Sequence, residues 1–127
     1  MVIFDSNIWI AFLNKDDSQH KKALTVFENI KDNSLVFITE YLVIEICSVL
    51  AMRAGNKIAD SFLDMIMNNE DVEILSSSNQ FFENIVSFFR KQNIKKLSFV
   101  DVSLLFLSRK YEIITFDKEL QKALKIL

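Results

Sequence analysis

Acidic residues stand at the ends of two short apolar runs, and these are the residues with the clearest chemical meaning. Asp5 directly follows Val2–Phe4, and Asp117 directly follows Ile113–Phe116. Short apolar runs of this kind predict buried strands. If the two strands are neighbours in a parallel sheet, both carboxylates lie at its carboxyl edge, where α/β proteins hold their ligands.

Two further acids fall within predicted helices. Thr39 and Gly55 mark the start and the end of a long helix, and Glu45 lies inside it between two isoleucines. A carboxylate in this apolar setting needs a partner, because burying an unpaired charge is costly. Asp101 lies in the first turn of a helix predicted to begin after Ser98. All four acids could therefore converge on one crevice beyond the strand ends.

Such a convergence would need a counter-ion. Two unit charges about 4 Å apart repel each other by about 4 kcal/mol at an effective dielectric constant of about 20. Either some of the acids are protonated, with raised pKa values, or a cation neutralises them. Oxygen ligands alone select a hard ion such as Mg²⁺ or Mn²⁺. Because such an ion can activate water and hold a phosphate oxygen, the pattern predicts phosphodiester hydrolysis.

Taken singly, the aspartates also have a structural explanation. Asp5 and Asp117 could each cap the helix that follows, because aspartate is a favoured N-cap residue. Asp101 stands three residues after Ser98, which is the spacing of a capping box with Asp in place of the usual Glu or Gln. The sequence leaves both interpretations open for each aspartate. Capping does not explain Glu45, which lies in the middle of its helix.

Composition limits the remaining possibilities. The chain has 127 residues, of which 50% are hydrophobic, and we expect residues 1–127 to form one globular domain. A single cysteine, Cys47, excludes an internal disulfide and a multi-cysteine zinc site. The only histidine, His20, is interpreted as a packing residue. One glycine and no proline leave no Gly-rich phosphate loop. We find no membrane span and no signal peptide, and expect a cytoplasmic protein.

Strand and helix patterns alternate along the whole chain. This alternation predicts an α/β fold, a three-layer α/β/α sandwich with a central parallel sheet. The apolar runs that predict its strands are Val2–Phe4, Leu35–Ile38, Val72–Leu75 and Ile113–Phe116, with Ile126–Leu127 as a possible edge strand.

Two groups of residues point to contacts with other molecules. The densest basic cluster is made of Arg90, Lys91, Lys95 and Lys96. Just before it, the helix from Phe81 to Phe89 is so rich in phenylalanine that its apolar face is wider than one stripe. Such a face is typical of a core or a subunit interface, and here it favours a dimer surface.

Four fragments together resemble one known family. They are Phe4-Asp5-Ser6-Asn7, Thr39-Glu40-Tyr41-Leu42-Val43-Ile44-Glu45, Leu97-Ser98-Phe99-Val100-Asp101 and Ile113-Ile114-Thr115-Phe116-Asp117-Lys118. In this order and spacing they resemble a PIN domain, most closely the small ribonucleases that are the VapC-type toxins of toxin–antitoxin pairs. The resemblance covers essentially the whole chain. It implies a sheet of order 3-2-1-4-5, an endoribonuclease activity, a homodimer and a cognate antitoxin protein.

The resemblance also assigns roles to individual residues. Asp5, Glu45, Asp101 and Asp117 match the catalytic, metal-binding acids of the family, and Ser6, Asn7 and Thr115 match polar residues that support them. Many relatives carry a further acid shortly after the last aspartate, where this chain has Glu119 and then Leu120. One Mg²⁺ or Mn²⁺ ion is therefore expected. The candidates for contact with RNA are Arg53, Lys57, Arg90, Lys91, Lys95, Lys96 and Lys118, each of which could equally be a solvated surface residue.

Three other functions are compatible with parts of the pattern. The first is a catalytically silent PIN-like module that acts only by protein association, although such a module needs no acidic cluster. The second is a PIN nuclease that matures ribosomal RNA, although the chain is short and has no added RNA-binding domain. The third is an aspartyl-phosphate phosphatase, which Asp5 at the end of a first strand would suit. Asn7 stands where such phosphatases have their second aspartate, which argues against this function.

Overall fold

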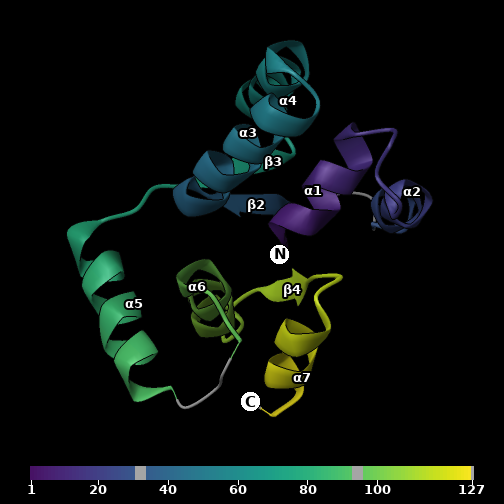
Figure 1. Cartoon of the computed structure of the whole chain (residues 1–127). Coiled ribbons are helices and arrows are strands. Elements are labelled where there is room, and N and C mark those ends of the chain that lie inside the picture. Colours follow the sequence, from purple (N-terminus) through teal and green to yellow (C-terminus); the bar gives the residue numbers. More distant parts are fainter. Residues whose placement is uncertain (31–33, 93–95, 127) are drawn as a thin grey trace.

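The computed structural model describes residues 1–30, 34–92 and 96–126 (Figure 1). Strands and helices alternate along this part of the chain, as the hydrophobic pattern predicts. The strands are β1 (Val2–Phe4), β2 (Val36–Thr39), β3 (Val72–Leu75) and β4 (Glu112–Ile114). The helices are α1 (Ser6–Leu13), α2 (His20–Glu28), α3 (Glu40–Arg53), α4 (Asn56–Asn68), α5 (Asn79–Lys91), α6 (Phe99–Leu107) and α7 (Lys118–Ile126).

The four strands form one parallel sheet in the order β3-β2-β1-β4. The predicted parallel sheet is confirmed, as are the first four places of the expected strand order. β1 and β4 are direct neighbours, with Ile3 opposite Ile113 and Phe4 opposite Ile114. The two segments that carry Asp5 and Asp117 therefore leave the sheet at the same edge.

Two expectations about the end of the chain are wrong. Ile126 was expected in a fifth, edge strand, but it is the last residue of α7. The helix forms here because residues 118–126 bury Leu120 and Ala123, which stand at helical spacing. Leu127, the other residue of the expected strand, lies outside the described residues. β4 ends at Ile114 and does not continue to Phe116. The reason is that the backbone N–H of Phe116 donates to the side chain of Asn7, at 3.1 Å, and not to a neighbouring strand.

The helices cover the sheet in two groups. Helices α1, α2, α3 and α4 pack against one another, and α6 packs against both α5 and α7. The first group connects β1 to β2 to β3, and α5 and α6 connect β3 back to β4 at the opposite edge. Right-handed crossovers place connections that run in opposite directions on opposite faces of a sheet. The result is the predicted three-layer sandwich, with the two groups on either side of the strands (Figure 1).

Aromatic and branched side chains fill the core between the sheet and the first helical layer. Trp9 is 1% exposed, and its ring lies 6.0 Å from that of Phe4 and 5.7 Å from that of Phe62. Edge-to-face contacts of this kind add to the stabilisation from burial. Among the described helices, none is long and apolar enough to cross a membrane.

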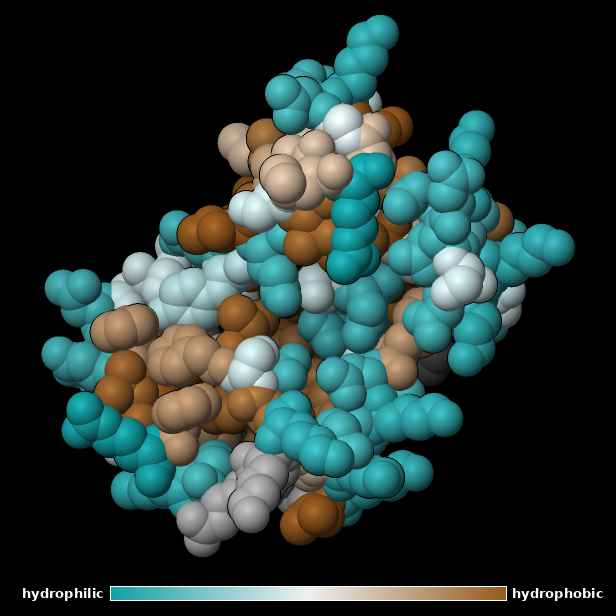
Figure 2. Space-filling model, viewed as in Figure 1, coloured by the Kyte–Doolittle hydropathy of each residue, from teal (hydrophilic) through white to brown (hydrophobic). Residues whose placement is uncertain are grey.

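An aromatic face remains partly open to solvent on α5 and α6, and we define it by Phe82, Phe89 and Phe99. The ring of Phe99 lies 6.0 Å from that of Phe82 and 5.6 Å from that of Phe89. Phe82 is 49% exposed and Phe89 is 42% exposed, whereas Phe81 and Phe88 turn inward and contact Phe106. Apolar side chains gather over these two helices, with hydrophilic ones around them (Figure 2).

Candidate active site

Asp5 is a buried carboxylate with four polar contacts. It follows β1 and is the N-cap of α1, so that one of its oxygens, Oδ1, accepts from the backbone N–H of Ser6 at 2.7 Å. Ser6 Oγ lies 3.5 Å from the same oxygen. Asp5 Oδ2 accepts from Thr115 Oγ1 at 2.7 Å and from Asn7 Nδ2 at 3.3 Å. Burial raises the pKa of Asp5, and the charges of Asp101 and Asp117 add to this rise, whereas the hydrogen bonds from Thr115 and Ser6 oppose it.

Thr115 and Asn7 tie the two acidic segments together. Thr115 Oγ1 accepts from Asn7 Nδ2 at 3.2 Å and from the backbone N–H of Asp117 at 3.0 Å. Asn7 Oδ1 accepts from the backbone N–H of Phe116 at 3.1 Å. Buried polar groups that are fully bonded in this way hold their neighbours in one arrangement. The loop after β4 is therefore fixed against the start of α1.

Glu45 points from α3 into the same region. Its neighbour Ile46 is buried and its other neighbour Ile44 is 66% exposed, so Glu45 lies at the boundary of the helix's core face. The carboxylate oxygen Oε2 is buried and has no hydrogen-bond partner among the described residues. Burial raises the pKa of Glu45, and the charges of Asp5 and Asp101 raise it further, against a smaller opposing effect of the Ser6 side chain. This buried oxygen without a partner is the strongest indication that Glu45 could bind a cation.

Asp101 and Asp117 cap helices, as their structural explanation predicts. The Asp101 carboxylate accepts from the backbone N–H of Ser98 at 3.0 Å, and the Asp101 backbone N–H donates to Ser98 Oγ at 3.1 Å, which completes the capping box of α6. Asp117 Oδ1 accepts from the backbone N–H groups of Glu119 at 2.8 Å and Leu120 at 3.3 Å, at the start of α7. Asp101 and Asp117 can bond to helix starts and still belong to the site, because the charges of both act on Asp5.

These residues have the right donor atoms for a metal ion, but their side chains are not gathered closely enough to surround one. The donors are all carboxylate oxygens, which suit a hard cation. Asp5 and Glu45 are each influenced by the charge of Asp101, so the acids lie within electrostatic reach of one another. In the part of the chain that the structure describes, however, no three acidic, histidine or cysteine side chains form a group that could hold a metal ion.

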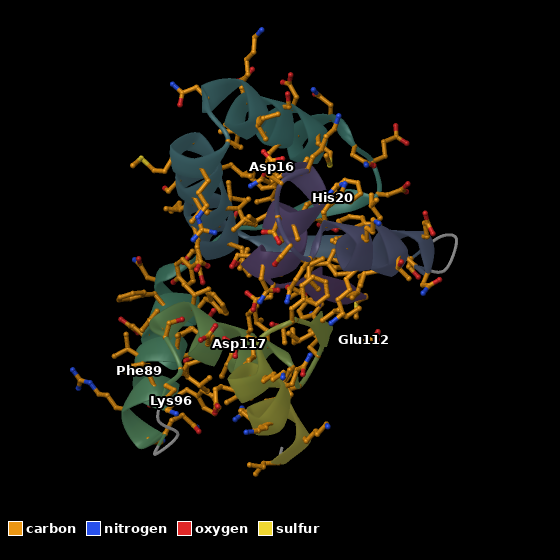
Figure 3. All side chains as sticks on the ribbon, turned by 45° about the vertical axis from the view of Figure 1, so that its right-hand side comes forward. Asp16, His20, Phe89, Lys96, Glu112 and Asp117 are labelled. Atoms are coloured by element: carbon orange, nitrogen blue, oxygen red, sulfur yellow. The ribbon has the colours of Figure 1, made fainter. Side chains whose placement is uncertain are left out.

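The basic residues lie in separate places around this site. Arg90 and Lys91 end α5, and Lys96 is exposed with a φ of 71° just before α6. Lys118 begins α7 directly after Asp117, which Figure 3 labels. Of the other candidates, Arg53 ends α3 and Lys57 lies in α4, and Lys95 is outside the described residues.

Two residues of α2 differ in what the sequence predicted: a packing role was predicted for His20, whereas no role was predicted for Lys22. His20 Nδ1 lies 2.6 Å from the carbonyl oxygen of Ala11, which supports a packing role between α1 and α2. Lys22 was not singled out by the sequence analysis, yet its Nζ lies 5.5 Å from the centre of the Phe116 ring, beside Asp117. No local pattern could have found this contact, because it joins residues at opposite ends of the chain.

Comparison with known proteins identifies the fold and the family. The chain has a structure similar to that of Mycobacterium tuberculosis VapC20, a toxin that cleaves the sarcin-ricin loop, with a TM-score of 0.85 and 17% sequence identity over 97% of this chain and 95% of that one. Among curated proteins, none matches the sequence. The family model of the PIN domain matches residues 2–125, which is nearly the entire chain. The protein therefore belongs to the PIN domain family.

Proposed function

We propose that this protein is a metal-dependent endoribonuclease that hydrolyses phosphodiester bonds of RNA, and that it is the toxin of a type II toxin–antitoxin pair. The observation that carries the proposal is the buried, unpartnered oxygen of Glu45 beside the buried carboxylate of Asp5, each with a raised pKa. A protein gains nothing in stability from such a pair. The two acids are explained if a cation joins them during function.

In this proposal each polar residue of the site has a defined task. Asp5, Glu45, Asp101 and Asp117 would hold Mg²⁺ or Mn²⁺, and Asp5 is kept in place by Ser6, Asn7 and Thr115. When bound, such an ion activates a water molecule and neutralises charge on the scissile phosphate. The chain's own residues orient the carboxylate of Asp5 through the hydrogen bonds from Ser6, Asn7 and Thr115. The side chain of Glu119 pairs with Lys122 and makes no hydrogen bond to the four acids among the described residues. The proposal therefore needs only one ion.

The partners follow from the same proposal. VapC20, which shares the fold, is a toxin that acts on an RNA loop, and this supports RNA as the substrate class and an antitoxin protein as the inhibitor. The aromatic face of Phe82, Phe89 and Phe99 supports a homodimer, because exposed apolar surface of this kind is typical of subunit contacts. The particular RNA would be selected by surface shape and loops around the acids.

The decisive experiment is cleavage of a mixed single-stranded RNA by the purified protein. We expect cleavage with Mg²⁺ or Mn²⁺, none with EDTA, and none by an Asp5→Asn variant that remains folded. Thermal unfolding with and without Mn²⁺ should show that the ion stabilises the wild type and not the variant. If wild type and variant are equally inert and neither responds to Mn²⁺, the protein is a silent interaction module, and Asp5, Asp101 and Asp117 serve only at the starts of their helices.

The basic cluster at the end of α5 should draw RNA towards the acids. Reversing charge at Arg90, Lys91 and Lys96 should weaken RNA binding and flatten its dependence on salt, because fewer counter-ions are released on binding. The comparison variant reverses two charges, at Arg53 and Lys57, and the effects are compared per reversed charge. Arg53 lies eight residues beyond Glu45 on α3, about 12 Å along the helix axis, so a smaller effect is expected there. An unchanged salt dependence in the first variant would remove the cluster from the RNA path.

A further inference from the structure

A lysine on α2 stands at the edge of the acidic site on the side away from the basic cluster of α5. Helix α2 is held in place by two contacts: Ala23 is fully buried, and Nδ1 of His20 lies 2.6 Å from the carbonyl oxygen of Ala11. Lys22 lies between these two anchoring residues and is itself exposed. Its backbone is therefore held against α1 while its side chain reaches into solvent.

The side chain of Lys22 extends to Phe116, which belongs to the acidic site's own loop. Lys22 Nζ lies 5.5 Å from the centre of the Phe116 ring. Phe116 is fixed by the hydrogen bond from its backbone N–H to Asn7 Oδ1, and its neighbours in the chain are Thr115 and Asp117. A cation over an aromatic face is attracted by the negative potential of the ring. The ring thus favours one position of the ammonium group, over the residue between Thr115 and Asp117.

Among the described residues, no carboxylate forms an ion pair with this ammonium group. The single ion pair there joins Lys122 and Glu119, at 3.9 Å. The ammonium group lies over the ring of Phe116, the residue that precedes Asp117 in the chain. It remains available to an anion that approaches the site from solvent.

We propose that Lys22, held over Phe116, binds a backbone phosphate of the RNA next to the one that is cleaved. This inference rests on the proposed nuclease function and adds to it a binding position that the sequence did not reveal. An RNA strand approaching four carboxylates is repelled, and fixed cations on both sides of them offset the repulsion. Lys96 lies on one side of Asp117 and the start of α2, at His20, lies on the other (Figure 3). The strand would therefore be held on both sides of the acids.

The test compares two neighbouring lysines in RNA binding. Binding of a fluorescent single-stranded RNA is measured over a range of salt concentrations in the Asp5→Asn background, which prevents cleavage. Lys22→Met should weaken binding severalfold and reduce the slope of log K against log salt by about 0.7, the value for one phosphate contact in a single strand. Lys21→Met is the matched control, because Lys21 is exposed on the same helix without a contact to the acidic loop, and should leave the slope nearly unchanged.

A second variant separates phosphate binding from a structural role. Lys22→Arg should restore both the affinity and the slope, because arginine also stacks on aromatic faces and binds phosphate. Equal effects of Lys21→Met and Lys22→Met would overturn the inference, since only overall charge would then matter. No effect of Lys22→Met would overturn it as well and leave the nuclease function intact. If the wild type neither binds nor cleaves RNA, the proposed function and the inference are both wrong.

Discussion

At the scale of single residues, two carboxylates of the site, those of Asp5 and Glu45, are costly to keep ionised because they are buried. Glu45 shows this most clearly, because one of its oxygens is buried without a partner. Its raised pKa means that the folded protein binds its proton more tightly than the unfolded chain does. Glu45 therefore destabilises the fold as pH rises from the ordinary range of a glutamate through the raised value. Below that range the acid is protonated in both states and this cost disappears.

Replacing Glu45 by glutamine should therefore stabilise the metal-free protein. We expect Glu45→Gln to raise the midpoint of thermal unfolding near neutral pH, and to lose this advantage in acid. Glu83→Gln is the matched control, because Glu83 is an exposed acid on α5 whose removal changes the net charge equally. Mn²⁺ should narrow the difference by stabilising the wild type. A lower midpoint for Glu45→Gln at neutral pH would mean that the carboxylate already has a stabilising partner.

Thr115 is the residue on which the remaining polar contacts depend. Its hydroxyl donates to Asp5 and accepts from Asn7 and from the backbone of Asp117. Thr115→Val keeps the shape but removes all three bonds, and leaving buried polar groups unsatisfied costs about 1–3 kcal/mol. We expect a loss of this size in chemical denaturation, together with weaker cleavage. Thr115→Ser retains the hydroxyl and should behave nearly like the wild type; a loss in Thr115→Ser as large as that in Thr115→Val would mean that the hydroxyl's hydrogen bonds do not account for the effect.

At the scale of elements, the ends of helices place the acids. Asp5, Asp101 and Asp117 each bond backbone N–H groups at the start of α1, α6 and α7. Negative charge is favoured there by the helix dipole and the free N–H groups. The sequence left open whether each aspartate caps a helix or belongs to the site. The two roles do not exclude each other, because one carboxylate can have both.

The capping box of α6 offers a test of this double role. Ser98→Ala removes the hydroxyl that accepts from the backbone N–H of Asp101 and should cost about 1 kcal/mol of stability. Cleavage should fall further than this loss of stability explains, because Asp101 is then less firmly aimed. Ser87→Ala, at an exposed position of α5, serves as the control. If Ser98→Ala loses stability but cleaves normally, the orientation of Asp101 is not set by its cap.

At the scale of the whole molecule, the two helical layers have different surfaces. The first layer packs aromatic side chains tightly between α1, α4 and the sheet, whereas α5 packs mainly on α6 and leaves the aromatic face partly open. An apolar surface of this kind is expected to be covered by another molecule. In the proposed homodimer, the second copy would cover this face, next to the helix that carries Asp101.

The dimer can be tested by making this face polar. The double variant Phe82→Ser, Phe89→Ser should sediment as a single chain while its unfolding midpoint at high dilution stays near that of the wild type. Met67→Ser, which alters a 69% exposed apolar residue on α4, should leave the dimer intact. A wild type that sediments as a monomer at all concentrations would refute the assignment.

The sequence by itself determined those features that depend on neighbouring residues. Strands were evident as short apolar runs, the start of α3 as Thr39, and the start of α6 as the spacing of Ser98 and Asp101. The alternation of these elements was sufficient for the three-layer fold, because right-handed crossovers leave few arrangements. The strand order was expected only from the resemblance to the PIN family. Asp5, Asp101 and Asp117 could be named because they stand at strand ends and helix starts, and Glu45 because it lies between two isoleucines inside a helix.

Only the tertiary structure decided what depends on residues distant in the chain. The hydrogen bond from Thr115 to Asp5 spans 110 positions, and the position of Lys22 over Phe116 joins α2 to the loop before α7. β4 ends early because Asn7 takes a backbone N–H that a longer strand would have used. Hydrophobic spacing and capping preferences act within a turn or two of the chain, so they report which elements form. Burial, charge and the partners of each carboxylate arise only when those elements pack together.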